Sequence, residues 1–211
     1  MRAILLLFIL LFSCKTFAQS VSGEQIKENV TAFLTDSTSA DHWTKVKAIF
    51  EQNEEALTSR HFFLLYYAQG VKPSPTYTSL EVNAERMQLM HYVRAKRYKK
   101  AIELGENLMQ ENPFDLTTLV YLSMSLDKLK RNTDNKYYTR MRQIVEAILS
   151  TGDGRTPETA IKVANIGDDQ VMLGLTDFKT FKASFKLVGP HVVWENSSGE
   201  NLYFEHVMMF P

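Results

Sequence analysis

The sequence of 211 residues contains a single cysteine, Cys14, close to its N-terminus. Processing of the N-terminal segment would either remove this residue or turn it into a lipid attachment point. The mature chain would then have no disulfide bond and no thiol chemistry, although exported compartments permit disulfides. Packing and hydrogen bonding alone must therefore hold the core.

The chain also lacks an excess of either charge, because 24 lysine and arginine residues balance 24 aspartate and glutamate residues. This balance, without a basic patch interleaved with aromatic residues, gives no support for binding to nucleic acid. After residue 12 no apolar run is long enough to span a bilayer. We therefore expect no nucleic-acid partner, and contact with a membrane only through the N-terminal segment.

Catalytic signatures are missing as well. The sequence has no Gly-x-Ser-x-Gly nucleophile elbow and no His-Glu-x-x-His metal motif. Adjacent carboxylates occur at residues 54–55 and 168–169, but neighbours in a helix or strand do not face each other and make poor acid–base pairs. We assign no catalytic residue, no metal ligand and no cofactor, although carboxylates distant in sequence could still meet in a cleft.

The N-terminus has the layout of a secretory signal, in which one arginine precedes an apolar run from Ala3 to Phe12. Small residues at positions 16 and 18 favour cleavage before Gln19, so that residues 1–18 form the signal peptide. Alternatively, "LFSC" at residues 11–14 resembles a lipobox, with Cys14 as the lipidated residue. We expect an exported protein that is periplasmic or extracellular, or else anchored through Cys14.

Residues 19–150 carry a helical periodicity. Ser22 and Gln25 predict a capping box at the start of the first helix. The segment "RHFFLLYYAQ", residues 60–69, is apolar nearly all round and predicts a buried helix that ends at Gly70. The segment from Tyr98 to Pro113 resembles the second helix of a tetratricopeptide repeat. Only one such repeat is convincing, so a helical hairpin within a globular bundle is the favoured interpretation.

Beyond residue 155 the apolar period changes from 3.6 to 2, which predicts strands over residues 160–166 and 181–187 and a terminal hairpin. A short helix capped by Asp168 is expected between them. The predicted fold class is therefore α+β, with an N-terminal helical bundle followed by a small, mostly antiparallel sheet. Residues 151–211 form this β-rich region, which we expect to pack with the helices as one unit.

The stretch "STGDGRTPETAIKV", residues 150–163, is predicted to be the junction between the two regions. Gly152 follows the last helix in a position that suits a left-handed glycine, and Pro157 favours extended backbone before the strand. A phosphate-binding loop would instead open a helix, and a calcium loop would need more acidic ligands than Asp153 and Glu158.

The terminal hairpin is predicted to turn at Ser198-Gly199, which places His191 opposite His206 and Trp194 opposite Tyr203. A metal site would need a third ligand near the histidines, so a packed or solvated pair is the favoured interpretation. Large apolar side chains on both faces predict that the hairpin is covered on both sides.

Aromatic residues supply the candidate binding surface. A groove lined by aromatic side chains could bind an envelope protein or a peptide, although a buried core is the favoured interpretation for the segment from residue 62 to residue 77. The candidate residues are Tyr66, Tyr67, Tyr77, Trp194 and Tyr203.

Four short stretches, "TGDGRTPETAIKV", "DDQVMLGL", "KLVGPHVVWE" and "ENLYFEHV", together with the upstream "LLYYAQGVKPSPTY", resemble an uncharacterised family of exported Bacteroidota proteins, domain of unknown function 4919. The resemblance covers most of the mature chain. The chain departs from the family pattern at "DDQ", where an aromatic third residue is expected. The resemblance implies an exported compartment and an architecture, and it implies no catalytic residue.

Two functions of different classes follow from these patterns. The first is a non-catalytic interaction or structural module of the bacterial cell envelope, which the signal sequence, the helical hairpin and the missing catalytic signatures favour. The second is a periplasmic hydrolase whose active site forms only in the folded protein. A pocket that holds two or more carboxylates or histidines without a structural partner would favour the second, and a smooth helical face that bears a groove would favour the first.

The N-terminal pattern makes a direct prediction about processing. The protein isolated from its native host is expected to begin at Gln19, or else at a lipidated Cys14. Mass spectrometry of the intact protein and of its N-terminal peptide distinguishes the two. A cytoplasmic protein that still begins at Met1 would overturn the expectation of export.

Overall fold

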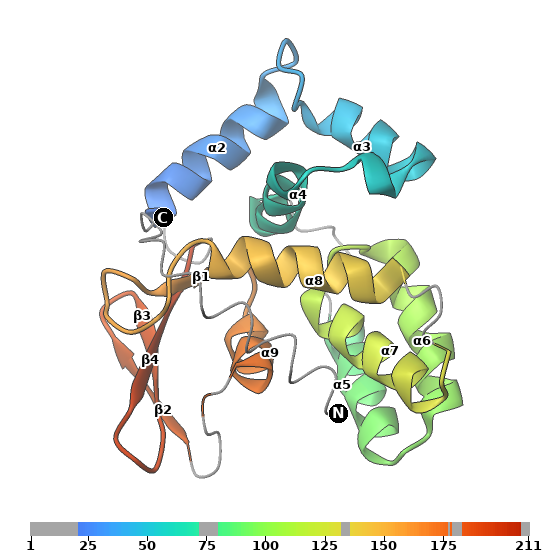
Figure 1. Cartoon of the computed structure of the whole chain (residues 1–211), viewed down its shortest axis with the longest axis vertical. Coiled ribbons are helices and arrows are strands. Elements are labelled where there is room, and N and C mark those ends of the chain that lie inside the picture. Colours follow the sequence, from blue (N-terminus) through green and yellow to red (C-terminus); the bar gives the residue numbers. More distant parts are fainter. Residues whose placement is uncertain (1–20, 72–79, 132–135, 177, 179–182, 208–211) are drawn as a thin grey trace.

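The computed structural model describes residues 21–71, 80–131, 136–176, 178 and 183–207, with the side chains of residues 71 and 80–83 left out. Helices fill the first part and a small sheet follows, so the fold is α+β as predicted (Figure 1). The elements in chain order are α2 (Gly23–Thr35), α3 (Trp43–Gln52), the 3-10 turn η1 (Glu54–Ala56), α4 (Ser59–Val71), α5 (Leu80–Arg94), α6 (Tyr98–Glu111), α7 (Leu116–Lys128), α8 (Lys136–Leu149), β1 (Ile161–Val163), α9 (Asp168–Leu175), β2 (Ser184–Val188), β3 (His191–Glu195) and β4 (Asn201–His206).

The predicted capping box of the first helix is confirmed, whereas the predicted end of α4 is corrected. The Ser22 hydroxyl accepts from the Gln25 backbone amide while the Gln25 side chain accepts from the Ser22 amide, which is the predicted capping box. Asp115 caps α7. By contrast, α4 continues through Gly70 to Val71. A tertiary hydrogen bond holds its last turn, in which the side-chain amide of Gln69 donates to the Phe114 carbonyl at 3.0 Å.

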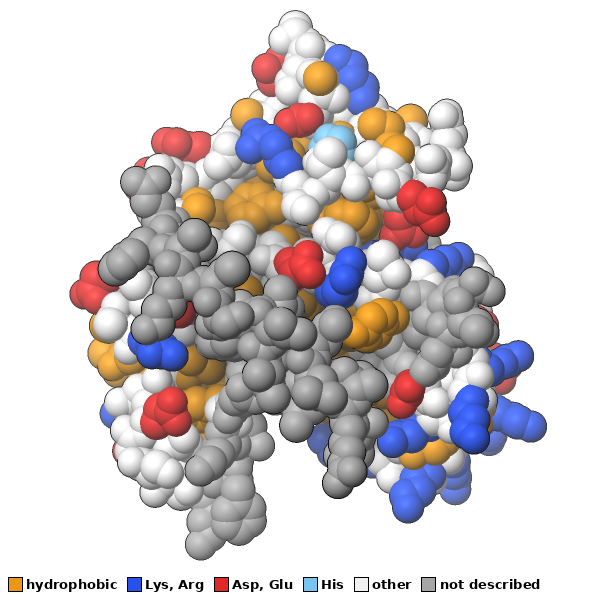
Figure 2. All heavy atoms as spheres, viewed as in Figure 1, with side chains coloured by type: hydrophobic (Ala, Val, Ile, Leu, Met, Phe, Trp, Pro, Cys, Tyr) orange, Lys and Arg blue, Asp and Glu red, His pale blue; other side chains and the backbone are white. Residues whose placement is uncertain are grey.

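The predicted helical hairpin, which ends at Pro113, is formed by α5 and α6, and α6 also packs closely on α7 at Gly105. A Cβ atom at this position would lie only 3.2 Å from the Leu122 Cβ. A small residue in α6 therefore lets α6 and α7 approach closely. Lysine and arginine side chains gather around the end of the molecule formed by this hairpin (Figure 2).

Arg140 in α8 is buried and connects this helix to η1 and to the segment before α7. Its guanidinium donates twice to the Glu54 carboxylate, at 2.6 Å each, and once to the Pro113 carbonyl at 3.0 Å. Its charged plane lies 4.8 Å from the centre of the Phe50 ring. A buried arginine is stable only when its donors find acceptors, and here a bidentate carboxylate and a carbonyl provide them.

The sheet has the strand order β1-β4-β3-β2, in which β1 pairs with β4 in parallel and the other pairs are antiparallel. One cluster of buried apolar side chains extends from Ile26 in α2 through Leu119 in α7 to Phe204 in β4. Helices and sheet therefore share this core. Figure 1 shows α9 between the sheet and the helices α5, α6 and α7.

The register of the terminal hairpin differs from the prediction by one residue. His191 pairs with Glu205, and Trp194 pairs with Leu202. The reason is a longer loop, which the Asn196 backbone amide closes by donating to the Glu200 carbonyl at 3.0 Å, with Gly199 left-handed at φ 77°. A slip of one residue moves side chains to the other face, so His191 and His206 lie on opposite faces of the sheet.

The junction after α8 ends the helix and leads into the strand, as predicted, but Gly152 is not left-handed; Gly154 is, at φ 70°. Gly152 is required for space instead. A Cβ there would lie 2.7 Å from the Ala160 carbonyl oxygen and closer still to that of Thr159. The junction also pairs with the sheet, because the Tyr203 amide donates to the Gly154 carbonyl at 2.8 Å.

The crowding at Gly152 predicts a large cost for a single methyl group. Gly152→Ala should lower the free energy of unfolding by about 1–3 kcal/mol, because the clash is with backbone atoms that cannot move aside cheaply. Gly174→Ala in α9 is the matched control, since no described atom outside its own surroundings lies within 4 Å of the added Cβ. Urea unfolding followed by far-ultraviolet circular dichroism measures both. Equal stabilities for the two variants would contradict the close approach.

Candidate functional site

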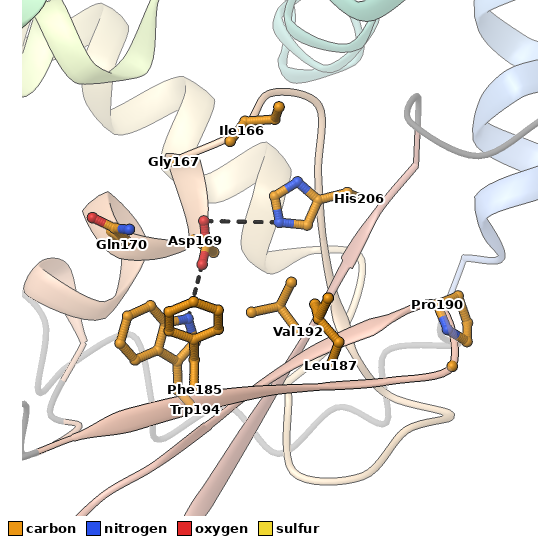
Figure 3. Close-up of a pocket in the computed structure, with 11 residues that line it drawn as sticks. Ile166, Gly167, Asp169, Gln170, Phe185, Leu187, Pro190, Val192, Trp194 and His206 are labelled. Atoms are coloured by element: carbon orange, nitrogen blue, oxygen red, sulfur yellow. Dashed lines mark hydrogen bonds and ion pairs between the residues drawn. The ribbon is translucent and has the colours of Figure 1, made fainter.

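A groove of about 350 Å³ lies between the beginning of α9 and one face of the sheet (Figure 3). Residues from five segments line it. They are Ile166, Gly167, Asp169 and Gln170 at the start of α9, Phe185 and Leu187 in β2, Gly189 and Pro190 in the turn, and Val192, Trp194 and His206 in β3 and β4.

Local sequence signals explain how these residues come together. The period of two in β2 and β3 puts Phe185, Leu187, Val192 and Trp194 on the same face of the sheet, since Phe185 pairs with Trp194 and Leu187 with Val192. Gly189 forms the turn between these two strands and is left-handed at φ 59°. Paired strands and a tight turn therefore place an apolar wall beside α9.

The start of α9 forms the opposite side of the groove. Its N-cap is Gly167, left-handed at φ 92°, and not Asp168 as the sequence predicts. Asp168 is instead the first helical residue and turns inward. A left-handed glycine lets the chain reverse sharply into the helix. Neighbouring side chains of a helix are about 100° apart, so Asp168 and Asp169 point in different directions.

The rim of the groove is unusually apolar for a surface. Ile166 is 74% exposed, Phe185 60% and Leu187 73%. The Phe185 and Trp194 rings lie with their centroids 5.2 Å apart. Contiguous exposed apolar side chains beside a concavity are typical of surfaces that bind another molecule.

The base of the groove is polar. The Trp194 indole donates to the Asp169 Oδ2 atom at 2.8 Å, and the His206 Nε2 atom lies 3.8 Å from the Asp169 Oδ1 atom, beyond hydrogen-bond distance. Neither ring nitrogen of His206 has a hydrogen-bond partner among the described residues. Burial lowers the pKa of His206 although Asp169 opposes this, so the ring is neutral near pH 7.

Behind the groove, Asp168 is buried in a hydrogen-bond network. Its carboxylate accepts from the Tyr66 hydroxyl at 2.6 Å and from the Asn165 amide at 3.1 Å. Burial raises the pKa of the Asp168 carboxyl from 3.8 to about 7, and the charge of Asp115 adds to this, whereas the hydrogen bonds and the charge of Arg86 oppose it.

The structure places the five candidate residues in different environments. Trp194 lines the groove. Tyr203 pairs with Val193, so that its side chain lies on the opposite face of the sheet. Tyr66 and Tyr67 are 0% exposed and belong to the core, and therefore contribute no surface. Tyr77 lies outside the described residues.

Sequence reasoning missed most of the groove. Phe185 and Leu187 are recognised as part of an alternating strand, but alternation alone does not tell whether the apolar face is covered. Asp169 is set aside because it neighbours Asp168. The two carboxylates indeed do not face each other, and each has a partner of its own, Trp194 for Asp169 and Tyr66 for Asp168.

Two further features of the described residues bear on the chemistry. No group of three or more histidine, cysteine, aspartate or glutamate side chains gathers there in a way that could hold a metal ion. None of the helices in the described ranges is both long and apolar enough to cross a bilayer.

These features define an α+β protein in which a helical region and a small mixed sheet share a core and leave an apolar groove beside α9. The chain belongs to the family called domain of unknown function 4919, which it matches over residues 24–207. No curated protein matches the chain. No solved structure matches it either.

The raised pKa of Asp168 predicts a specific pH dependence of stability. Between about pH 4 and pH 7 the folded chain binds a proton that the unfolded chain has lost, so this carboxyl lowers the free energy of unfolding as pH rises through that window. Asp168→Asn keeps an acceptor for Tyr66 but cannot ionise. The free energy of unfolding of the wild type, minus that of the variant, should therefore fall by a few kcal/mol from pH 4 to pH 8. The size follows from about 1.4 kcal/mol per unit of pKa shift. A difference that stays constant across this range would show that Asp168 titrates normally.

Proposed function

We propose that this chain is an exported binding module of the cell envelope, and that it holds an extended segment of a partner protein along β2 and in the groove beside α9. The observation that carries the proposal is the edge strand β2. All of its residues are exposed, and Phe185 and Leu187 point from it toward the groove. No described strand pairs with its outer edge.

An open strand edge beside an apolar groove suits an extended peptide. The backbone of the peptide can pair with β2, and its alternate side chains then reach the groove face beside Phe185 and Leu187. Natural edge strands are usually protected by charge, proline or a bulge. Here only Lys186 carries a charge, and it already contacts the Glu195 carboxylate at 3.2 Å. The edge is thus poorly protected against pairing, which supports a partner strand.

A second copy of the chain is a less suitable occupant. The antiparallel pairing that joins all five residues of two β2 strands places Lys186 directly opposite Lys186 of the other copy. Like charges in such a position are destabilising. A partner segment with an apolar or acidic residue at that position has no such conflict.

The hydrolase alternative has one observation in its favour, the Asp169 carboxylate near His206. Two features count against it. Both His206 ring nitrogens are shielded from solvent, so a water molecule in the groove has no access to them. The described residues that line the groove include no serine, threonine, cysteine or lysine that could act as a nucleophile. The arrangement therefore favours binding over hydrolysis.

Selection from a peptide library tests the proposed function and reveals the sequence preference of the groove at the same time. A library of displayed hexapeptides is selected on the wild type alone. Affinities of the selected peptides are then measured through the fluorescence of Trp194. The measurement is made in a Trp43→Phe background, because the sequence has two tryptophans and this change leaves Trp194 alone. Peptides with apolar residues at alternate positions should be enriched. Leu187→Glu should weaken them at least about tenfold, because a carboxylate would be buried against apolar side chains.

The control is Met87→Glu, which introduces the same charge at a methionine on α5 that is 62% exposed. This variant should bind the peptides as the wild type does, and circular dichroism should be unchanged for both. The proposal fails if the selected peptides bind Leu187→Glu and the wild type equally well, or if no peptide is enriched.

A further inference from the structure

A second surface lies at the other end of the molecule, where the chain gathers basic residues. Because α5, α6 and α7 run antiparallel, the end of α5, the start of α6 and the end of α7 lie side by side, and Figure 2 shows lysine and arginine side chains concentrated there. We call this surface the basic end. Its residues are Arg94, Lys96, Arg97, Lys99, Lys100, Lys128, Lys130 and Arg131, all of them exposed.

The neutral composition of the whole chain conceals this concentration. Eight of the 24 basic residues belong to the basic end, so the remaining sequence has more acidic than basic residues. The overall balance of charge therefore does not show how the charges are distributed over the fold. The signal is visible in the stretches "RAKRYKK" and "KLKR", which are distant in sequence but adjacent in the fold.

The charges of the basic end are not neutralised by the protein. None of its eight residues forms an ion pair with a described residue, whereas exposed cations elsewhere do, as in the pairs Lys47–Glu51 and Arg60–Asp41. Lys96 and Lys130 are also the described non-glycine residues with positive φ, at 57° and 55°. Unpaired like charges repel one another. The approach of an anionic partner therefore lowers the electrostatic free energy of this surface.

Exposed methionines accompany the charges. Met87 precedes Arg94 by seven residues on α5, and Met124 precedes Lys128 by four residues on α7. These spacings put each methionine on the same helical face as a basic residue. Met87 is 62% exposed and Met124 is 42% exposed. The basic end therefore combines positive charge with flexible apolar side chains.

We propose that the basic end adsorbs to the surface of a bilayer that contains anionic lipids. Clustered lysine and arginine side chains are attracted to such a surface by about 1 kcal/mol each, and apolar side chains among them enter the boundary between headgroups and acyl chains. Long basic side chains keep their charges at the headgroups while their stems contact the apolar layer.

A lipid surface suits this end better than a single-stranded nucleic acid. Nucleic-acid sites combine basic residues with aromatic side chains on which bases stack. Tyr92 and Tyr98 at the basic end are only partly exposed, and the Lys100 ammonium lies 5.9 Å from the centre of the Tyr92 ring. The exposed large apolar side chains described on α5 and α7 are methionines, and the exposed aromatic one, Phe185, lies at the groove. In Figure 1 the sheet and the helices α6 and α7 lie on opposite sides of α9. Adsorption through the basic end would therefore leave the groove open.

Sedimentation with vesicles tests this proposal. The purified mature chain is mixed with vesicles of phosphatidylcholine alone or of phosphatidylcholine with phosphatidylglycerol, at low and at high salt. The wild type should sediment with the anionic vesicles at low salt, and high salt should release it because the Debye length shortens. Lys99→Gln, Lys100→Gln and Lys128→Gln combined should lower the partition coefficient at least about tenfold.

The matched control also removes three positive charges, but from side chains that have acidic partners. It combines Lys47→Gln, Arg60→Gln and Lys186→Gln. This control should retain most of the binding to anionic vesicles. The double variant Met87→Ser and Met124→Ser leaves the charge unchanged and should lower the partition coefficient a few fold. Equal losses in the two triple variants would mean that net charge alone matters. Equal binding to neutral and anionic vesicles, or tighter binding to a single-stranded oligonucleotide at the same salt, would also overturn the proposal.

Discussion

The position of α9, and with it the groove, depends on the hydroxyl group of one buried tyrosine. The Tyr66 hydroxyl donates to the Asp168 carboxylate at 2.6 Å and accepts from the Ala164 backbone amide at 3.1 Å. The neighbouring Tyr67 donates to the Lys162 carbonyl at 2.8 Å. Two adjacent residues of α4 thus hold the end of β1 and the beginning of α9. Since buried polar groups are costly when unpaired, this network strongly favours one arrangement of the turn from residue 164 to residue 168.

The same turn separates two neighbouring carboxylates by environment. Asp168 faces inward to Tyr66, where burial raises its pKa to about 7. Asp169 faces the groove and accepts from the Trp194 indole, which connects α9 to β3. The hydrogen bond from Trp194 and the network around Tyr66 therefore hold α9 from opposite sides. An apolar groove with a polar base is the consequence, and its rim residues Ile166 and Leu187 stay exposed.

Periodicity and capping residues predict the elements of this fold well. The capping box at Ser22 and the change from helices to strands both follow from local physics and are confirmed. The hairpin register is wrong by one residue because loop length depends on how Asn196 closes the turn. The groove could not be predicted, since it depends on contacts such as Tyr66 to Asp168, which are 102 positions apart. The basic end was missed because residues near 97 and 130 meet only through the antiparallel packing of helices.

Hydrogen exchange of backbone amides tests the role of Tyr66 most directly. Tyr66→Phe removes the hydroxyl that both donates to Asp168 and accepts from Ala164. Tyr67→Phe removes a hydroxyl that contacts the Lys162 carbonyl in β1 and the Thr151 side chain, neither of which belongs to α9. In Tyr66→Phe the amides of α9 should exchange at least about tenfold faster than in the wild type, while those of α6 and α7 keep their protection. Tyr67→Phe should leave α9 protected. Unchanged protection of α9 in Tyr66→Phe would contradict the account, because α9 and the groove would then be held without this hydroxyl.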